Sequence, residues 1–231
     1  MNLGESCKQN RIFLGLWLAT VVLLTIALCV VDKASLHLAL CDHHTPWADA
    51  LMPVLSDFAN WLPYLVAVVL LIVNWRAGLF LTGSLLLSTG LVQLLKHLVC
   101  APRPLTWFAE NYPDITLPLT EGVTMNYWLS FPSGHTTTFF CLFFALCVIG
   151  TQWLASSNLP IQTKQLSGIL LQVVSFILTV VCSYSRIYLS QHFAADVLGG
   201  MILGVISVVI VGLIFHLSGT AISKPKPECQ Q

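Results

Sequence analysis

The stretch VLGGMILGVISVVIVGLIFHL, Val197–Leu217, decides the fold of this chain. It runs for 21 residues without an Asp, Glu, Lys or Arg, and about 20 apolar residues in a helix cross the hydrocarbon core of a bilayer. Similar uncharged stretches cover residues 12–31, 58–75, 77–95, 136–154 and 166–184. Only 9% of the 231 residues are charged, against roughly 25% in soluble domains. The sequence therefore predicts an all-α integral-membrane bundle of six transmembrane helices, formed as a single domain over residues 1–231.

Charge and cysteine content narrow the classes of function. Basic and acidic residues number 10 each, so the net charge is zero, and we expect no binding to nucleic acid. The eight cysteines show no metal-binding spacing and no disulfide framework, although the sequence leaves open whether Cys41 and Cys100 pair. His43 and His44 are adjacent and would face apart on a helix, so we interpret them as surface residues rather than metal ligands. Nothing in the sequence indicates an obligatory protein partner.

Lysine and arginine are distributed unevenly between the two sides of the predicted bundle. Six spans put both termini on one side, which carries Lys8, Arg11, Arg76, Lys164, Lys224 and Lys226. The other side carries eight of the ten acidic residues and the cations Lys33, Lys96, Arg103 and Arg186. Because cytoplasmic loops carry an excess of Lys and Arg, we expect a protein of the cell (inner) membrane with both termini in the cytoplasm. The second side then faces the exoplasm or periplasm.

Two long connections lie on that second side. In residues 32–57, leucines alternate with Asp and His residues, a pattern that favours a helix lying in the membrane interface. Residues 104–131 contain several aromatic residues, which settle at headgroup depth. This second connection is either an ordinary interfacial loop or a lid beside a lipid-facing pocket, and the sequence leaves both interpretations open.

Three polar segments also fall on this second side, each at the boundary of a predicted span. They are KHLVCAPRP (96–104), FPSGHTTTFF (131–140) and SRIYLSQHFAAD (185–196). A clustering of cations at one membrane face costs free energy unless an anion offsets their repulsion. The segments therefore indicate an anion-binding site.

The candidate anion ligands suit a phosphoryl group. Arginine pairs bidentately with phosphate oxygens, and lysine acts as a point charge. A Ser-Gly pair at the start of the fourth span would present the unpaired N–H groups of a helix N-terminus. The candidate phosphate-binding residues are Lys96, Arg103, Ser133, Gly134 and Arg186.

The same segments supply candidate catalytic residues. His192 and Asp196 are four residues apart and share a helix face, so the carboxylate can orient the imidazole and leave its other nitrogen free to attack phosphorus. His135 comes from another span and is placed to protonate the leaving alkoxide. No carboxylate cluster of the kind that holds Mg²⁺ accompanies them, so we expect no metal and no cofactor.

These three segments resemble the tripartite signature of the type 2 phosphatidic acid phosphatase (PAP2) superfamily, KxxxxxxRP, PSGH and SRxxxxxHxxxD, at every motif position. The resemblance implies a membrane lipid phosphatase of the bacterial type that works through a phosphohistidine on His192, with Asp196 as its orienting partner and His135 as general acid. It implies a phosphorylated lipid as substrate, from the phosphatidic acid, phosphatidylglycerophosphate, undecaprenyl diphosphate or lipid A class.

Three other functions fit the same residues less well. A lipid-to-lipid phosphotransferase would use the same covalent chemistry with a different acceptor. A vanadium haloperoxidase-type enzyme would bind vanadate in a similar cage, but the six spans and the lack of a large soluble domain disfavour it. A transporter would use the cations only to bind an anion.

Overall fold

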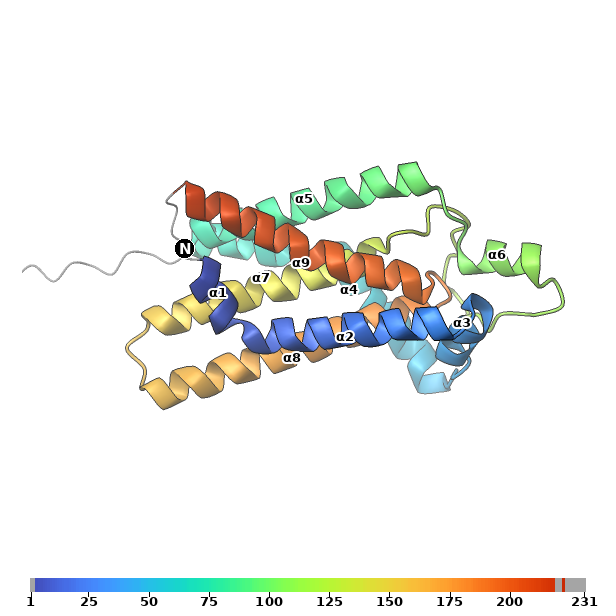
Figure 1. Cartoon of the computed structure of the whole chain (residues 1–231), viewed down its shortest axis with the longest axis horizontal. Helices are drawn as coiled ribbons and strands as arrows, with labels where there is room; N and C mark the ends of the chain where they lie inside the picture. The colour runs from blue at the N-terminus through green and yellow to red at the C-terminus, as the bar shows by residue number, and fades with distance from the viewer. Residues whose placement is uncertain (1–2, 219–221, 223–231) are drawn as a thin grey trace, which may run out of the picture.

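The computed structural model describes residues 3–218 and 222, and these residues form helices and irregular connections (Figure 1). Lys224 and Lys226, assigned above to the cytoplasmic side, lie outside the described residues. The helices are α1 (Leu3–Gln9), α2 (Arg11–Val30), α3 (Lys33–Cys41), α4 (Pro46–Val73), α5 (Trp75–Val99), α6 (Pro104–Asn111), α7 (Gly134–Ser156), α8 (Ile161–Tyr188) and α9 (Ala194–Leu217).

Six of these helices, α2, α4, α5, α7, α8 and α9, are long and apolar enough to cross a membrane. They confirm the six predicted spans and the all-α bundle. The largest difference is α4, which begins at Pro46 instead of Phe58 and includes two prolines in its interior. The predicted span was the uncharged stretch that follows Asp57, so its start was placed too late. The interfacial helix predicted within residues 32–57 is therefore confined to α3.

Short polar residues set several helix boundaries. Asp32 caps α3, because its carboxylate accepts a hydrogen bond of 3.0 Å from the N–H of Ser35. Asn74 separates α4 from α5 and caps α5 by accepting from the N–H groups of Arg76 and Ala77 at 3.2 and 3.4 Å. Asn74 thus forms the tight connection between the antiparallel helices α4 and α5.

Helix α7 lies at the centre of the bundle and packs against α5, α8 and α9. Its buried face includes Phe140 and Phe144, and Phe13 of α2 stacks on Phe144 with ring centroids 5.1 Å apart. Contact with α9 is close because of two glycines: a Cβ on Gly204 would lie 2.6 Å from the carbonyl oxygen of Thr137, and one on Gly200 would lie 2.7 Å from that of Ser133. Only glycine permits this approach of the two backbones.

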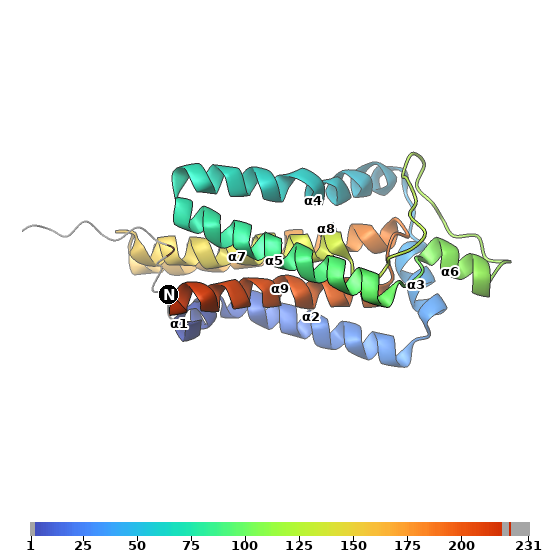
Figure 2. The same cartoon turned by 90° about the horizontal axis from the view of Figure 1, so that it is seen from above.

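The described parts of the two termini lie at one end of the bundle, together with the α4–α5 and α7–α8 connections (Figure 1). At the opposite end lie α3, α6, the irregular segment that follows α6, and the α8–α9 junction (Figure 2). This arrangement brings the three polar segments to one end.

Candidate active site

The candidate nucleophile lies in a tight turn between α8 and α9. The carbonyl oxygen of Arg186 accepts hydrogen bonds from the N–H groups of Gln191 and His192, at 3.0 and 3.1 Å. Ser190, within this turn, has a φ of 48°, a left-handed conformation that costs free energy for a non-glycine residue. The turn buries the His192 side chain, which is 1% exposed, directly beside the end of α8.

Asp196 is fixed at the start of α9 beside His192. Its Oδ2 accepts the N–H of Phe193 at 2.9 Å and the hydroxyl of Ser130 at 2.6 Å. The Nδ1 of His192 lies 3.5 Å from the same oxygen and forms no hydrogen bond within the described structure. Catalytic hydrogen bonds are often long without substrate and shorten in the reacting complex. The pair therefore has the geometry of an imidazole and its orienting carboxylate.

The environment of His192 keeps its ring neutral. Burial lowers the pKa of His192 from 6.5 to about 3, opposed by the Asp196 carboxylate and assisted by the positive charges of Arg186 and Arg103. A neutral imidazole retains the lone pair that a nucleophile needs.

Arg103 is held by groups from two other segments. Its Nη1 donates to the side-chain oxygen of Gln191 at 2.9 Å and to the backbone oxygen of Gln191 at 3.2 Å. Its Nε donates to the backbone oxygen of Trp128 at 3.0 Å. Gln191 is in turn anchored through its amide N–H to the carbonyl oxygen of Thr124 at 3.0 Å. A guanidinium held in this way is positioned before any ligand arrives.

Arg186 lines a cavity of about 340 Å³ at this end of the bundle. Its Nη1 donates to the hydroxyl of Ser56 on α4, while its buried Nε has no hydrogen-bond partner in the described structure. His135 and Gln191 line the same cavity. A buried guanidinium with an unpaired N–H requires an acceptor, and a phosphate oxygen is suited to this role.

Lys96 and the start of α7 complete the group of candidate ligands. Lys96, in the last turn of α5, lies near enough to Arg103, Arg186 and Asp196 for its charge to interact with each. The hydroxyl oxygen of Ser133 caps α7, and the backbone N–H of Ser133 donates to the backbone oxygen of Asp196 at 2.9 Å. Both groups of Ser133 therefore already have hydrogen-bond partners within the protein. Gly134 begins α7, where a backbone N–H has no partner within the helix.

His135 stands between two cavities. Besides the cavity that contains Arg186, it lines a second one of about 170 Å³ formed by residues of α4, α5 and α7. Asn60 lines both cavities, and Tyr64 and Gln93 at the α4–α5 side are exposed on the surface of the bundle. His135 also interacts electrostatically with Arg186 and His192. His135 would therefore lie between a phosphoryl group bound beside Arg186 and a leaving group that extends between α4 and α5.

The structure thus gathers the predicted site residues at one end of the bundle, and the comparison with protein families agrees with this arrangement. The family model described as the PAP2 superfamily matches residues 77–220, which include all three polar segments. This chain belongs to the PAP2 superfamily. The sequence resemblance is therefore confirmed.

Two curated relatives are themselves named as lipid phosphatases. Phosphatidylglycerophosphatase B of Bacillus subtilis (strain 168) is 29% identical over 100 residues, which are 43% of this chain and 43% of that protein. The match thus spans less than half the length of that relative. YbjG of Escherichia coli (strain K12), which carries an undecaprenyl-diphosphatase assignment, is 27% identical over 180 residues, 75% of this chain and 77% of that protein.

Two crystal structures share the fold. LpxE of Aquifex aeolicus superposes with a TM-score of 0.59 at 22% identity, covering 78% of this chain and 94% of LpxE. A transmembrane PAP2-type phosphatidylglycerolphosphate phosphatase of Bacillus subtilis superposes with a TM-score of 0.54 at 21% identity, covering 87% of this chain and 94% of the other. The described part of the chain has the helical membrane-bundle fold of PAP2 proteins, and the protein is a multi-pass membrane protein.

Four residues of this PAP2 site were missed in the sequence. Ser130 donates a hydrogen bond to Asp196. Gln191 accepts one from Arg103, and Ser56 accepts one from Arg186. His37 on α3 contacts the turn between α8 and α9, with its Nε2 3.3 Å from the hydroxyl oxygen of Ser190. None has a distinctive spacing, although Ser130 and Gln191 lie within or beside the motif segments and a search for polar neighbours of the motifs would have included them.

The remaining sequence expectations concern metals and disulfides. Among the described residues there is no group of three or more His, Cys, Asp or Glu side chains that could hold a metal ion. The Nδ1 of His44 lies 2.6 Å from a carboxylate oxygen of Asp49, and its ring stacks on a tyrosine. Cys41 is buried and Cys100 is exposed, and both are free thiols, so these two cysteines do not pair.

Proposed function

We propose that this chain is an integral-membrane phosphatase that hydrolyses a phosphate monoester or diphosphate of a lipid through a phosphohistidine on His192. The observation that carries the proposal is the buried, neutral His192 beside a fixed Asp196. It lies in the same turn as Leu189 and Gln191, which line the cavity with Arg186, whose guanidinium Nε is unpaired. Membership in the PAP2 superfamily supports it.

In the first step, the Nε2 of His192 attacks phosphorus and the bond from phosphorus to the lipid oxygen breaks. His135 gives a proton to that oxygen, so that the lipid leaves as an alcohol or, from a diphosphate, as a monophosphate. Asp196 accepts the Nδ1–H of His192 and stabilises the positive charge on the ring. In the second step, water gives a proton to His135 and attacks phosphorus, the phosphorus–nitrogen bond breaks, and phosphate leaves.

The five candidate phosphate ligands would stabilise the charge that develops on the phosphoryl oxygens. Arg103 and Arg186 supply fixed guanidinium groups, Lys96 a mobile ammonium, and Gly134 a backbone N–H at the start of α7. Ser133 contributes by fixing the first turn of α7, which carries Gly134. All these groups belong to the chain, so the proposed steps use no cofactor.

We infer that the substrate is a phosphorylated lipid presented by the bilayer that surrounds the protein. The cavity between α4 and α5 beside His135 supports this, because a leaving group with an acyl or prenyl chain has a path toward the membrane. The two curated relatives act on different lipids according to their names, so the proposal covers the whole class.

We further propose that the termini face the cytoplasm and the active site faces the exoplasm or periplasm of the cell (inner) membrane. Among the described residues, the end with the termini carries Lys8, Arg11, Arg76 and Lys164 and the single acidic residue Glu5. The excess of basic residues at that end follows the rule for cytoplasmic loops.

The decisive experiment is a phosphate-release assay with the purified protein against phosphatidic acid, phosphatidylglycerophosphate, undecaprenyl diphosphate and lipid A phosphates. We expect turnover of at least one, and a loss of about a thousandfold or more in His192→Ala. His43→Ala is the matched control, because His43 is an exposed histidine far from the turn in sequence. With labelled substrate, rapid quenching should leave acid-labile phosphate on the native protein and on His43→Ala but not on His192→Ala.

Normal turnover by His192→Ala would disprove its role as nucleophile. Transfer of the label to another lipid instead of water would identify a phosphotransferase. Phosphate uptake by vesicles without hydrolysis would identify a transporter, and bromide oxidation with vanadate and peroxide a haloperoxidase.

A further inference from the structure

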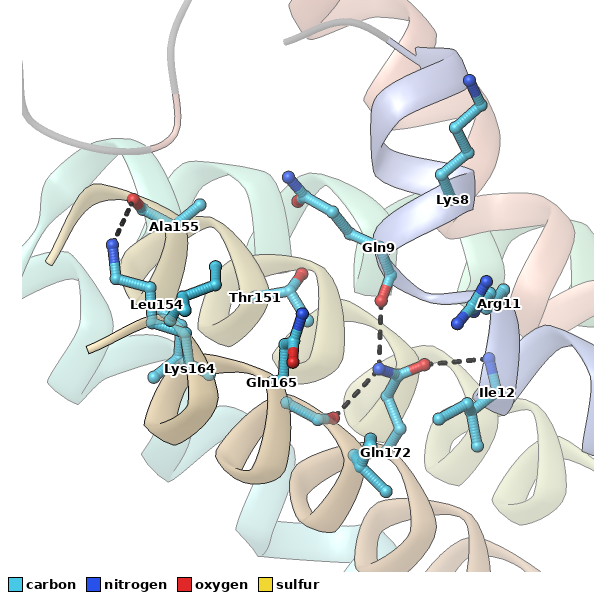
Figure 3. Close-up of a pocket in the computed structure, with 13 residues that line it drawn as sticks. Lys8, Gln9, Arg11, Ile12, Thr151, Leu154, Ala155, Lys164, Gln165 and Gln172 are labelled. Atoms are coloured by element: carbon cyan, nitrogen blue, oxygen red, sulfur yellow. Dashed lines mark hydrogen bonds between the residues drawn. The ribbon is translucent and has the colours of Figure 1, made fainter. Parts of the chain in front are cut away.

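A third cavity, whose lining is positively charged (Figure 3), lies at the end of the bundle opposite the active site. Its volume is about 470 Å³, and it is lined by residues of α1, the start of α2, the end of α7 and the start of α8. Lys8, Arg11 and Lys164 line it, and none of its lining residues in the described part of the chain is acidic. None of the steps proposed above uses this cavity.

The three cations have no anionic partner in the described structure. Its two ion pairs, His44 with Asp49 and His192 with Asp196, lie at the other end of the bundle. Lys164 donates one hydrogen bond, to the backbone oxygen of Ala155 at 3.1 Å, which leaves two of its N–H groups for another acceptor. Clustered cations without a carboxylate favour the binding of an anion.

The cavity has a fixed floor. Gln172 is 2% exposed, and its side-chain oxygen accepts the N–H groups of Ile12 and Phe13 at 3.1 and 3.2 Å. Its side-chain nitrogen donates to the backbone oxygens of Gln9 and Gly168 at 3.0 and 2.9 Å. This amide ties α2 to α8 and occupies these two N–H groups of α2. An anion would therefore be held by side chains, and Figure 3 shows Arg11 and Lys164 on opposite sides of Gln172.

The outer wall of the cavity is apolar and faces the membrane. Ile161 is 67% exposed and Ile169 is 45% exposed, and both line the cavity on α8. Arg11 and Lys164 lie in the first turns of the membrane-spanning helices α2 and α8, at the depth where lipid headgroups lie. A ligand that fits must combine an anionic group with an apolar chain.

We propose that this cavity binds an anionic phospholipid, with the headgroup phosphate between Arg11 and Lys164 and the start of an acyl chain along Ile161 and Ile169. The lipid comes from the leaflet that contacts the termini, so the site is separate from the proposed substrate site and faces the other membrane surface. Positive residues at a membrane boundary attract anionic lipids of the adjacent leaflet, and the cavity adds a defined place for one molecule.

The test uses the full-length protein in detergent and counts retained lipids by native mass spectrometry. The probes are dioleoyl phosphatidylglycerol and the zwitterionic dioleoyl phosphatidylcholine. We expect the native protein to retain phosphatidylglycerol at least fivefold more tightly than phosphatidylcholine. The double variant Arg11→Gln with Lys164→Gln should lose this preference. Arg76→Gln is the control, because Arg76 lies at the same end, stacks near the Trp75 ring and does not line the cavity.

A second variant separates the cavity from general surface charge. Gly168 lines the cavity, and a Cβ on it would meet only a leucine side-chain atom, at 4.0 Å. Gly168→Leu fills the space without changing any charge, and we expect it to lose the preference too. The proposal is overturned if either variant, folded by its thermal unfolding curve, keeps the preference, or if Arg76→Gln loses it equally. It is also overturned if millimolar inorganic phosphate displaces the lipid completely, because the site would then bind any phosphate ion.

Discussion

Ser130→Ala tests the proposed active site at a residue that carries no motif. Ser130 is fully buried, and its hydroxyl donates to Asp196 Oδ2 at 2.6 Å. The substitution removes this bond and leaves the second anchor, the N–H of Phe193, in place. The backbone bond from Ser130 to the carbonyl oxygen of Ala101 also remains, so we expect the segment to keep its course.

The size of the effect follows from the kind of bond that is lost. A hydrogen bond to a charged group contributes about 1.5–3 kcal/mol. If the loss appears in the transition state, where Asp196 must hold the imidazolium of His192, each ~1.4 kcal/mol lowers the rate tenfold. We therefore expect kcat to fall by about 10- to 150-fold, while KM changes little because Ser130 is not a candidate phosphate ligand.

The assay measures kcat, KM and the rate of phosphoenzyme formation for the purified variant. Ser84→Ala is the matched control: Ser84 is equally buried, but its hydroxyl donates to a backbone oxygen of its own helix at 2.8 Å. Both variants lose a buried hydroxyl, so a purely structural effect would lower their thermal unfolding temperatures alike and leave kcat similar. A Ser130→Ala enzyme with native kcat and native phosphoenzyme formation would show that Asp196 needs no help from Ser130, and the reasoning would be refuted.

Four further predictions test other parts of the structure. Gln191→Ala should raise KM by about tenfold, because Arg103 loses a charge-assisted side-chain hydrogen bond; an unchanged KM would contradict the role of Gln191. Gly204→Ala should lower the free energy of unfolding by about 1–3 kcal/mol, because its Cβ would meet backbone atoms of α7. Gly90→Ala is the control and should not destabilise the protein, because nothing lies within 4 Å of its Cβ. Equal melting curves for the two variants would refute this. Burial lowers the pKa of His37 to about 4, with Lys33 assisting and Asp196 opposing. The contribution of His37 to the free energy of unfolding is therefore complete above pH 6.5 and is lost as the pH falls toward 4. In denaturant titrations from pH 7 to pH 5, the native protein should lose about 2 kcal/mol more of its free energy of unfolding than His37→Gln. Parallel pH curves for the two proteins would contradict this. Vanadate, which resembles five-coordinate phosphorus, should inhibit turnover and EDTA should not, and the opposite pattern would contradict attack by an imidazole.

Much of the fold could be predicted because the bilayer imposes a strong constraint on sequence. A span must be about 20 apolar residues long, and stretches such as Val197–Leu217 carry this signal without help from tertiary contacts. The start of α4 could not be predicted in the same way. Residues 46–57 contain Asp49 and Asp57, which interrupt the uncharged stretch, as well as Pro53, and these features normally end a span. The residues remain helical because one face packs against the bundle, where Ala48 and Met52 are buried.

The candidate site likewise contains residues that could be predicted from the sequence and residues that could not. Only a few types of side chain can bind or attack a phosphoryl group, so Arg103, Arg186 and His192 were identifiable as candidates from type and placement. The residues that hold them can be any donor or acceptor of suitable length, and their partners are far away in sequence. Gln191 reaches Arg103 and Thr124, and Ser56 reaches Arg186 across 130 positions. Such pairs depend on how helices pack, which no spacing along the chain records.

Asp196 shows why packing and chemistry are coupled in this bundle. Its carboxylate lies 3.5 Å from the Nδ1 of His192 and accepts the hydroxyl of Ser130, while its backbone oxygen accepts the N–H of Ser133 at the start of α7. The position of α9 against α7 therefore sets the distance between the proposed nucleophile and the helix that carries Gly134 and His135. That position exists only because Gly200 lets α9 approach the carbonyl oxygen of Ser133, where a Cβ would lie 2.7 Å away. Gly200, which is not among the candidate site residues, thus determines whether the two halves of the site meet.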